Sequence, residues 1–144
     1  MKKKITILYH KKQMSRIEKI SKGDWIDLRL AETVTLKKGE YQLLSLGVSI
    51  QLPKGYEALV APRSSTFKNY GILLANSIGI IDETYCGDDD IWRFPALATR
   101  DITIPADTRI AQFRIIKHQP KIEFIIADKL SNSNRGGIGS TGTK

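Results

Sequence analysis

The sequence is poor in cysteine, since Cys86 is the only one among 144 residues. An internal disulfide is therefore excluded, and we interpret Cys86 as a small, partly buried hydrophobic side chain rather than a nucleophile. Histidine is also scarce, and His10 and His118 lack the spacing of a metal-ligand pair. A zinc site is accordingly not expected.

Long apolar runs are absent as well. No stretch approaches the roughly 20 apolar residues that a membrane helix needs. The short apolar run near the N-terminus is followed at once by Lys11 and Lys12, which makes it too short for a signal peptide. We therefore expect a cytoplasmic protein. The length and the hydrophobic content of 41% are those of one globular domain, residues 1–144, with a real core.

The formal net charge is +8, and five of the first twelve residues are lysines: Lys2, Lys3, Lys4, Lys11 and Lys12. Such a segment can form a solvated strand edge that discourages edge pairing, or it can attract polyanions. Aromatic residues do not alternate with these lysines as they do in proteins that bind single strands. We therefore expect neither nucleic acid nor a membrane as a partner.

Short strand-like runs separated by turns extend over most of the chain, which predicts an all-β sandwich or barrel. One helical segment is expected over 62–71, which has serines before the run and a glycine after it. Residues 13–20 could form either a short helix or an extended link. The expected strands are 4–9, 24–30, 41–52, 57–61, 72–75, 91–98, 101–104, 109–117 and 121–126.

The stretch 79–88 predicts a hairpin, in which a strand leads through a tight turn to a returning strand. Asp82 ends the first strand, where its carboxylate can face a pocket, and Tyr85 lies beyond the turn. Taken alone, an acid in a turn is usually only a turn residue. We interpret Asp88, Asp89 and Asp90 in the same way, as a solvated turn rather than metal ligands.

Five segments together resemble, in order and spacing, the five motifs of the homotrimeric dUTPases, which hydrolyse dUTP to dUMP and pyrophosphate. The similarity covers nearly the whole chain and is greatest to the short prophage-type enzymes. The residues that carry it are Asp27-Leu28-Arg29 with Ala31-Glu32; Pro62-Arg63-Ser64-Ser65; Gly79-Ile80-Ile81-Asp82 with Tyr85 and Gly87-Asp88; Arg109-Ile110-Ala111-Gln112; and Arg135-Gly136-Gly137-Ile138-Gly139-Ser140-Thr141-Gly142.

The resemblance implies a jelly-roll subunit and a homotrimer whose active sites lie between subunits. The glycine-rich tail, 131–144, would be mobile and would close over the site of a neighbouring subunit. Alone, such a tail would be interpreted as a flexible end. With the other motifs it completes a set of donors for a triphosphate, namely Arg63, Ser64, Ser65, Gln112, Arg135, Gly137, Ser140 and Thr141.

By the same resemblance, Asp82 activates the water that attacks the α-phosphate. Mg²⁺ would be held mainly by phosphate oxygens and water, with Asp27 acting only through water, so no cage of carboxylates is expected. The uracil edge would be bound near Asn76, Gly79 and Ile81, and Tyr85 would lie against the deoxyribose.

Three positions depart from the family pattern. Thr84 replaces a frequent acid, Cys86 replaces a frequent basic residue, and Ile138 stands where an aromatic ring usually covers the base. Alternation places Arg93 on the opposite face from Trp92 and Phe94, so we expect Arg93 to cover the uracil. Trp92 or Phe94 would do so if the strand were turned over.

Two alternative functions remain open. A dCTP deaminase shares the fold and a similar Arg-Ser-Ser segment, but deamination needs a glutamate and none occurs in 91–97. A regulatory protein that binds a phage or host repressor could use the same scaffold, although no sizeable insertion separates the motifs.

Overall fold

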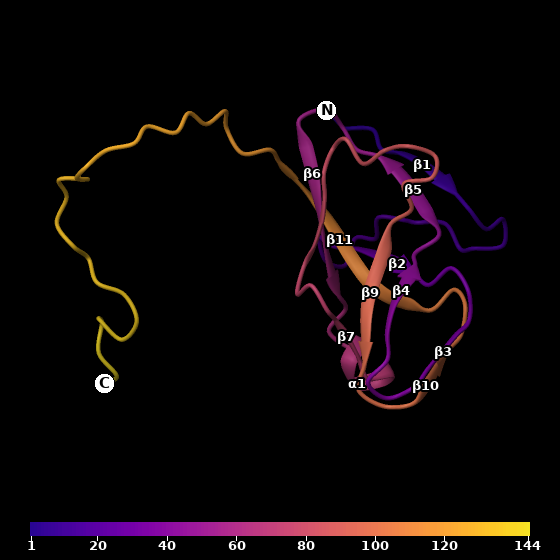
Figure 1. Cartoon of the computed structure of the whole chain (residues 1–144). Coiled ribbons are helices and arrows are strands. Elements are labelled where there is room, and N and C mark those ends of the chain that lie inside the picture. Colours follow the sequence, from indigo (N-terminus) through magenta and orange to yellow (C-terminus); the bar gives the residue numbers. More distant parts are fainter.

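The computed structural model describes residues 1–144 as an all-β protein with one short helix and an extended C-terminal tail, as the sequence predicted (Figure 1). The helix is α1 (Thr66–Tyr70). The strands are β1 (Thr6–Tyr9), β2 (Ile26–Arg29), β3 (Val34–Leu36), β4 (Tyr41–Ser45), β5 (Val48–Gln51), β6 (Tyr56–Pro62), β7 (Ile72–Leu74), β8 (Gly79–Ile81), β9 (Arg93–Ala98), β10 (Ile102–Ile104) and β11 (Arg109–Lys117).

The strands form antiparallel sheets in which no strand pairs with its immediate neighbour in the chain. A four-stranded sheet has the order β2-β11-β6-β8, and a three-stranded sheet has the order β4-β9-β7. Two further pairs, β1-β5 and β3-β10, complete the barrel-like body. This long-range antiparallel pairing gives the jelly-roll subunit that was expected.

The two larger sheets meet through aromatic side chains. Trp92 and Phe113 pack edge to face with ring centroids 5.3 Å apart, and both are fully buried. Strand β9 alternates as predicted: Phe94 and Ala96 face the core, whereas Arg93 and Leu97 face outward. This burial excludes Trp92 and Phe94 as covers for a ligand, because neither ring reaches the surface.

The predicted hairpin at 79–88 is wrong. Strand β8 pairs with β6, and the next strand, β9, belongs to the other sheet. The segment between them closes on itself instead: Tyr85 N–H donates to Asp82 O at 3.0 Å, and Asp90 N–H donates to Gly87 O at 3.1 Å. These successive turns use the backbone groups that a returning strand would need.

The expected strand 41–52 is interrupted between β4 and β5. Gly47 there has φ +70°, and a β-carbon at this residue would lie 2.3 Å from the sulfur of Met14. A glycine is thus required on both backbone and steric grounds. Met14 is buried, but 13–20 forms an extended link and not a helix.

Two other expectations fail at the surface. Residues 121–126 do not form a strand, because no neighbouring strand is available to them, and Phe124 and Ile126 are at least 90% exposed. Cys86 is exposed rather than partly buried, since it lies in the turn region after β8. No helix has the length and apolar character needed to span a bilayer.

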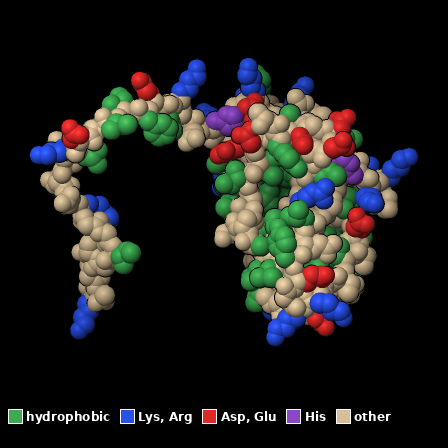
Figure 2. Space-filling view, in the orientation of Figure 1, with side chains coloured by type: hydrophobic (Ala, Val, Ile, Leu, Met, Phe, Trp, Pro, Cys, Tyr) green, Lys and Arg blue, Asp and Glu red, His purple; other side chains and the backbone are tan.

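The outward face of the β4-β9-β7 sheet is unusually apolar. Tyr41 is paired with Leu97, and Leu97 in turn with Leu73, so these side chains form a row across the three strands. Together with Leu43 they are each 37–58% exposed. Hydrophobic side chains gather on this part of the body (Figure 2). Contiguous apolar surface of this kind marks an interaction site.

The helix α1 lies where the sequence predicted, and it is attached to β11 by a buried hydroxyl. Gly71 ends the helix in the left-handed conformation, and its N–H donates to Phe67 O at 2.7 Å. Thr66 is fully buried; its hydroxyl accepts a hydrogen bond from Arg63 N at 2.9 Å and donates to Ile110 O at 2.7 Å. This residue therefore fixes the backbone before α1 against the start of β11.

Replacing Thr66 by valine should lower the free energy of unfolding by about 2–3 kcal/mol, because two buried backbone groups lose their partner. Thr66→Ser keeps the hydroxyl and should lose about 1 kcal/mol for the missing methyl group. Urea denaturation of both variants measures the difference. Equal destabilisation by valine and serine would contradict the hydrogen-bonding role.

Candidate active site

Three charged side chains converge at one end of the four-stranded sheet: Asp27 on β2, Arg109 on β11, and Arg63 directly after β6. Arg63 Nε lies 3.0 Å from Asp27 Oδ1, and Arg109 Nη1 lies 3.7 Å from Asp27 Oδ2. We call Asp27, Arg63 and Arg109 the arginine cluster. The two arginine side chains remain 33% and 42% exposed, so their guanidinium groups have donors left for an anion from solvent.

A β-bulge in β11 makes this convergence possible. The register with β2 shifts between Arg109 and Ala111, so that Arg109 is opposite Arg29 while Gln112 is opposite Asp27. Ile110 and Ala111 are both fully buried, which regular alternation would not allow. The extra residue turns Arg109 and Gln112 to the same face as Asp27.

Hydrogen bonds also position the segment that contains Arg63. Gln112 Nε2 donates to Pro62 O at 3.0 Å, on the adjacent strand β6. Thr66 holds Arg63 N from the other side. Ser64 is exposed and Ser65 half-buried, and neither hydroxyl is hydrogen bonded within the chain. Both therefore remain available to a ligand.

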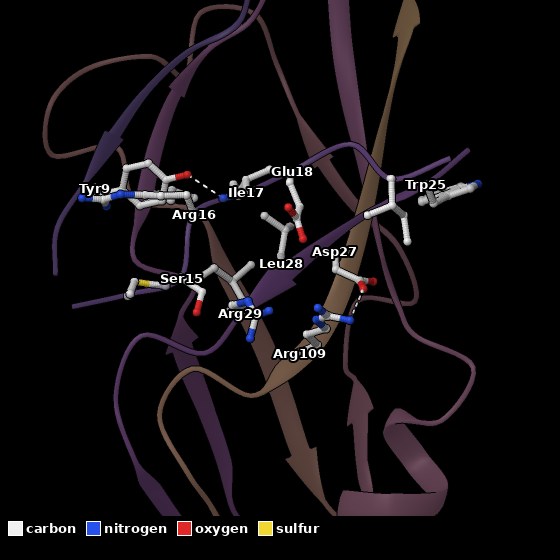
Figure 3. Close-up of a pocket in the computed structure, with 14 residues that line it drawn as sticks. Tyr9, Ser15, Arg16, Ile17, Glu18, Trp25, Asp27, Leu28, Arg29 and Arg109 are labelled. Carbon is white, nitrogen blue, oxygen red and sulfur yellow. Dashed lines mark hydrogen bonds and ion pairs between the residues drawn. The ribbon is translucent and has the colours of Figure 1, made fainter. Parts of the chain in front are cut away.

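The N-terminal link borders this cluster. Ser15 donates through its N–H and hydroxyl to Asp107, at 2.9 and 2.5 Å, and these bonds lower the pKa of the Asp107 carboxyl. A small cavity lies between the link and β2, with Asp27 and Arg109 among the residues that line it (Figure 3). None of the residues 76–85 lines it, so this cavity alone is not the complete predicted site.

Asp82 lies elsewhere, directly after β8. Its side chain is exposed, and Oδ2 accepts hydrogen bonds from the hydroxyl and the N–H of Thr84. The pKa of Asp82 is lowered from its ordinary value of 3.8. The hydrogen bond from the Thr84 hydroxyl contributes most to this shift, and the bond from the Thr84 N–H and the charge of His118 contribute less. Asp82 is therefore a carboxylate at neutral pH, as a proton acceptor must be.

One chain does not bring Asp82 to the arginine cluster. Ile81 is opposite Ala58 near the beginning of β6, whereas Arg63 follows its end. Five residues of extended chain separate Ala58 from Arg63, a distance of about 17 Å at ~3.3 Å per residue. The two predicted halves of the site are thus at opposite ends of the same sheet.

The predicted base- and sugar-binding residues accompany Asp82 along β8 and its flanking turns. Gly79 is buried, and a β-carbon there would lie 3.0 Å from Val60 Cβ. Asn76 is exposed, and Ile81 is half-buried. The hydroxyl of Tyr85 donates to Ile91 O at 2.9 Å, which orients the ring over the loop.

The tail leaves the body at the end of β11 and extends away from it (Figure 1). It contains local turns, in which Ser140 N–H donates to Gly137 O at 2.9 Å and Gly142 N–H to Gly139 O at 3.0 Å. Arg135, Ile138 and Thr141 are fully exposed and lie apart from both halves of the predicted site in the same chain.

Arg93 is exposed in β9, opposite Ser45. It lines a groove with Glu32 and Gln42 that includes none of the residues 76–88. The expectation that Arg93 faces the Asp82 region of its own chain is therefore wrong, because the two regions belong to different sheets.

Arg109 was not among the residues predicted from the sequence to bind a ligand, although it belongs to the fourth motif. Regular alternation along β11 would place Arg109 and Gln112 on opposite faces. Only the bulge at Ile110 puts them on one face, and the adjacent apolar residues Ile110-Ala111 were the available signal for it.

Comparison with known proteins assigns this arrangement to a family. The dUTPase family model matches residues 17–143. The chain belongs to the dUTPase family. The SPbeta prophage-derived deoxyuridine 5'-triphosphate nucleotidohydrolase YosS of Bacillus subtilis (strain 168) is 55% identical over 140 residues, with 97% of this chain and 99% of that protein covered.

Solved dUTPases have the same fold. A mutant dUTPase of Staphylococcus bacteriophage 80alpha in complex with dUpNHpp gives a TM-score of 0.78 at 19% identity, covering 97% of this chain and 99% of that one. A mutant dUTPase from phage phi11 of S. aureus, in which a structural Mg(II) ion is coordinated, gives 0.75 at 16% identity, covering 90% and 99%.

Arg109→Ala should weaken binding of dUpNHpp about tenfold or more, because a charge-assisted hydrogen bond contributes about 1.5–3 kcal/mol. Arg114→Ala is the matched control: Arg114 lies on the same strand, pairs with Asp24 at 3.3 Å, and carries the same charge. Isothermal titration calorimetry measures both affinities. An equal loss in the two variants would show that only net charge matters, not the position of Arg109.

Proposed function

We propose that this protein hydrolyses dUTP to dUMP and pyrophosphate. The observation that carries the proposal is the 55% identity to a prophage dUTP nucleotidohydrolase over 97% of the chain. The arrangement of the residues agrees with it, because arginines are grouped for phosphates and an ionised aspartate is available as a base. We assign the reaction to the cytoplasm.

Asp82 is the proposed general base. Its carboxylate accepts a proton from water while the water oxygen forms a bond to the α-phosphorus. The bond from the α-phosphorus to the oxygen bridging to the β-phosphorus breaks, and this oxygen leaves with pyrophosphate. Asp82 suits the role because β8 and the following turn hold its backbone in place.

The arginine cluster is the proposed binding site for the triphosphate. The guanidinium groups of Arg63 and Arg109 offer fork-shaped donors, and Asp27 keeps them oriented from behind. The hydroxyls of Ser64 and Ser65 are free to donate to phosphate oxygens. The side chain of Gln112 is engaged with Pro62 O, so its contribution is to hold this segment in place.

The donor set also fits a magnesium ion held chiefly by the substrate. No three His, Cys, Asp or Glu side chains converge as a metal site, and both oxygens of Asp27 face arginines. Asp27 would therefore reach the ion through water. When bound with the nucleotide, Mg²⁺ would neutralise part of the triphosphate charge.

The region around β8 is the proposed nucleoside pocket. Backbone groups at Gly79 and Ile81, with the amide of Asn76, would bind the uracil edge. The ring of Tyr85, fixed by its hydroxyl bond to Ile91 O, would lie against the deoxyribose and leave no space for a 2′-hydroxyl. Arg93 could cover the uracil only in the pocket of another subunit, since it faces away from its own.

A homotrimer with shared sites is supported by the distance between the two halves. The apolar face of β4-β9-β7 provides surface for association of subunits. One subunit would supply the nucleoside pocket with Asp82, and a second the arginine cluster. The tail of a subunit, residues 131–144, would add Arg135, Gly137, Ile138, Ser140 and Thr141 over the bound nucleotide.

The test is incubation of the purified protein with dUTP, dTTP, dCTP and UTP while pyrophosphate is measured. We expect rapid release of pyrophosphate from dUTP and much slower release from the others, because Tyr85 and the backbone exclude a 2′-hydroxyl or 5-methyl group sterically.

Asp82→Asn should fold and bind dUTP, but its kcat should fall by at least ~10², because the proposed general base is lost.

Equal rates on dUTP and UTP would contradict the proposed sugar contact. Release of ammonia from dCTP would favour a deaminase instead. A near-normal kcat for Asp82→Asn would remove Asp82 from the role of base.

A further inference from the structure

Thr84 makes two hydrogen bonds to the same oxygen of Asp82. Its N–H donates to Asp82 Oδ2 at 2.9 Å, and its hydroxyl donates to that oxygen as well. The other carboxylate oxygen, Oδ1, has no partner within the chain. An aspartate that accepts from the N–H two residues on forms an Asx turn, which only fixes the backbone. The hydroxyl is an additional contact.

The backbone of this turn is held without the help of that hydroxyl. Tyr85 N–H donates to Asp82 O at 3.0 Å. Glu83 Oε1 accepts from Gly55 N at 3.1 Å, and Glu83 Oε2 lies 3.4 Å from His118 Nε2, which ties the turn to β6 and to the end of β11. Removing the Thr84 hydroxyl should therefore change the carboxylate and not the fold.

The Asp82 side chain is exposed and contacts no other polar group that could fix its rotation. The torsion between Cβ and a carboxylate is broad, so an unrestrained carboxylate turns freely and exchanges its two oxygens. With Oδ2 bound twice, Oδ1 is left as the oxygen that faces outward.

We propose that Thr84 is a positioning residue for the Asp82 base: its hydroxyl locks Oδ2, so that Oδ1 alone accepts the proton of the attacking water. The proposal rests on the hydrolysis proposed above. It gives a role to a residue that replaces the acid frequent in this family, because a carboxylate at residue 84 could not donate to Asp82 and would repel it.

The same contact affects the pH dependence. Hydrogen bonds from Thr84 stabilise the ionised carboxylate and lower its pKa, with a smaller effect of the same sign from His118. The neighbouring elements also carry Tyr56 and Glu57 on β6, Arg114 and Lys117 on β11, and Glu83, Tyr85 and Cys86 in the turn. Without the Thr84 hydroxyl, the pKa of Asp82 rises towards its ordinary value, so activity on the acid side is lost at a higher pH.

The experiment compares Thr84→Val with Thr84→Ser in the full-length protein. Valine keeps the shape and the N–H bond but lacks the hydroxyl, and serine keeps the hydroxyl but lacks the methyl group. For valine we expect kcat for dUTP to fall about tenfold with KM within about twofold, because the base loses orientation and not substrate contacts. The acid limb of the kcat profile should move to higher pH. Serine should restore both.

A second measurement does not depend on activity. Carbon-13 NMR of labelled aspartate, with Asp82→Asn to assign the signal, gives the pKa of the Asp82 carboxyl in each variant. It should be below 3.8 in the wild type and with serine, and higher with valine.

An unchanged kcat and pH profile in a folded Thr84→Val protein would overturn the proposal. Equal impairment by valine and serine would overturn it too, because serine retains the hydroxyl and loss of that group could then not explain the effect. If the wild type fails to hydrolyse dUTP, the proposed function fails, and the NMR titration still decides whether the hydroxyl holds the carboxylate.

Discussion

The pairing of β6 with β11 and β8 constrains everything else in this molecule. Antiparallel register places the arginine cluster at one end of these strands and Asp82 near the other, about 17 Å apart along extended chain. A strand cannot be shortened to bring them together without moving its core side chains to the wrong places. A site that uses both groups must therefore combine surfaces of different subunits, which is the arrangement proposed here.

In each half of the proposed site, neighbouring residues that take no part in the reaction hold the functional side chains in position. Asp27 reduces the repulsion between two guanidinium groups by pairing with both, and the bulge in β11 aligns Arg109 with it. Around Asp82, the turn is anchored through Glu83, and Thr84 donates to one oxygen. Both halves depend on groups that are already fixed before a ligand binds, which limits the reorganisation that catalysis requires.

Much of the fold could be predicted from local patterns, because alternation and turn residues act over a few positions. The strand bounds 109–117 are confirmed, and so are the inward side chains of β9 and the helix after Ser65. The hairpin after Ile81 was wrong because partner choice depends on distant strands, here β6. The role of Arg109 was missed because a bulge is not visible in regular alternation. The motif resemblance implied a site between subunits, but it did not show which of the site residues one chain holds together and which it keeps apart.

The most direct test of the shared site is to mix two inactive subunits. One lacks the tail, residues 131–144, and keeps Asp82; the other carries Asp82→Asn and keeps the tail. Co-expressed and co-purified, they should recover about a quarter of the wild-type kcat, since random assembly joins an intact Asp82 to a tail from another subunit in that fraction of sites. Separately each should remain inactive. No recovery in mixed trimers, or full activity in a monomer, would contradict the account.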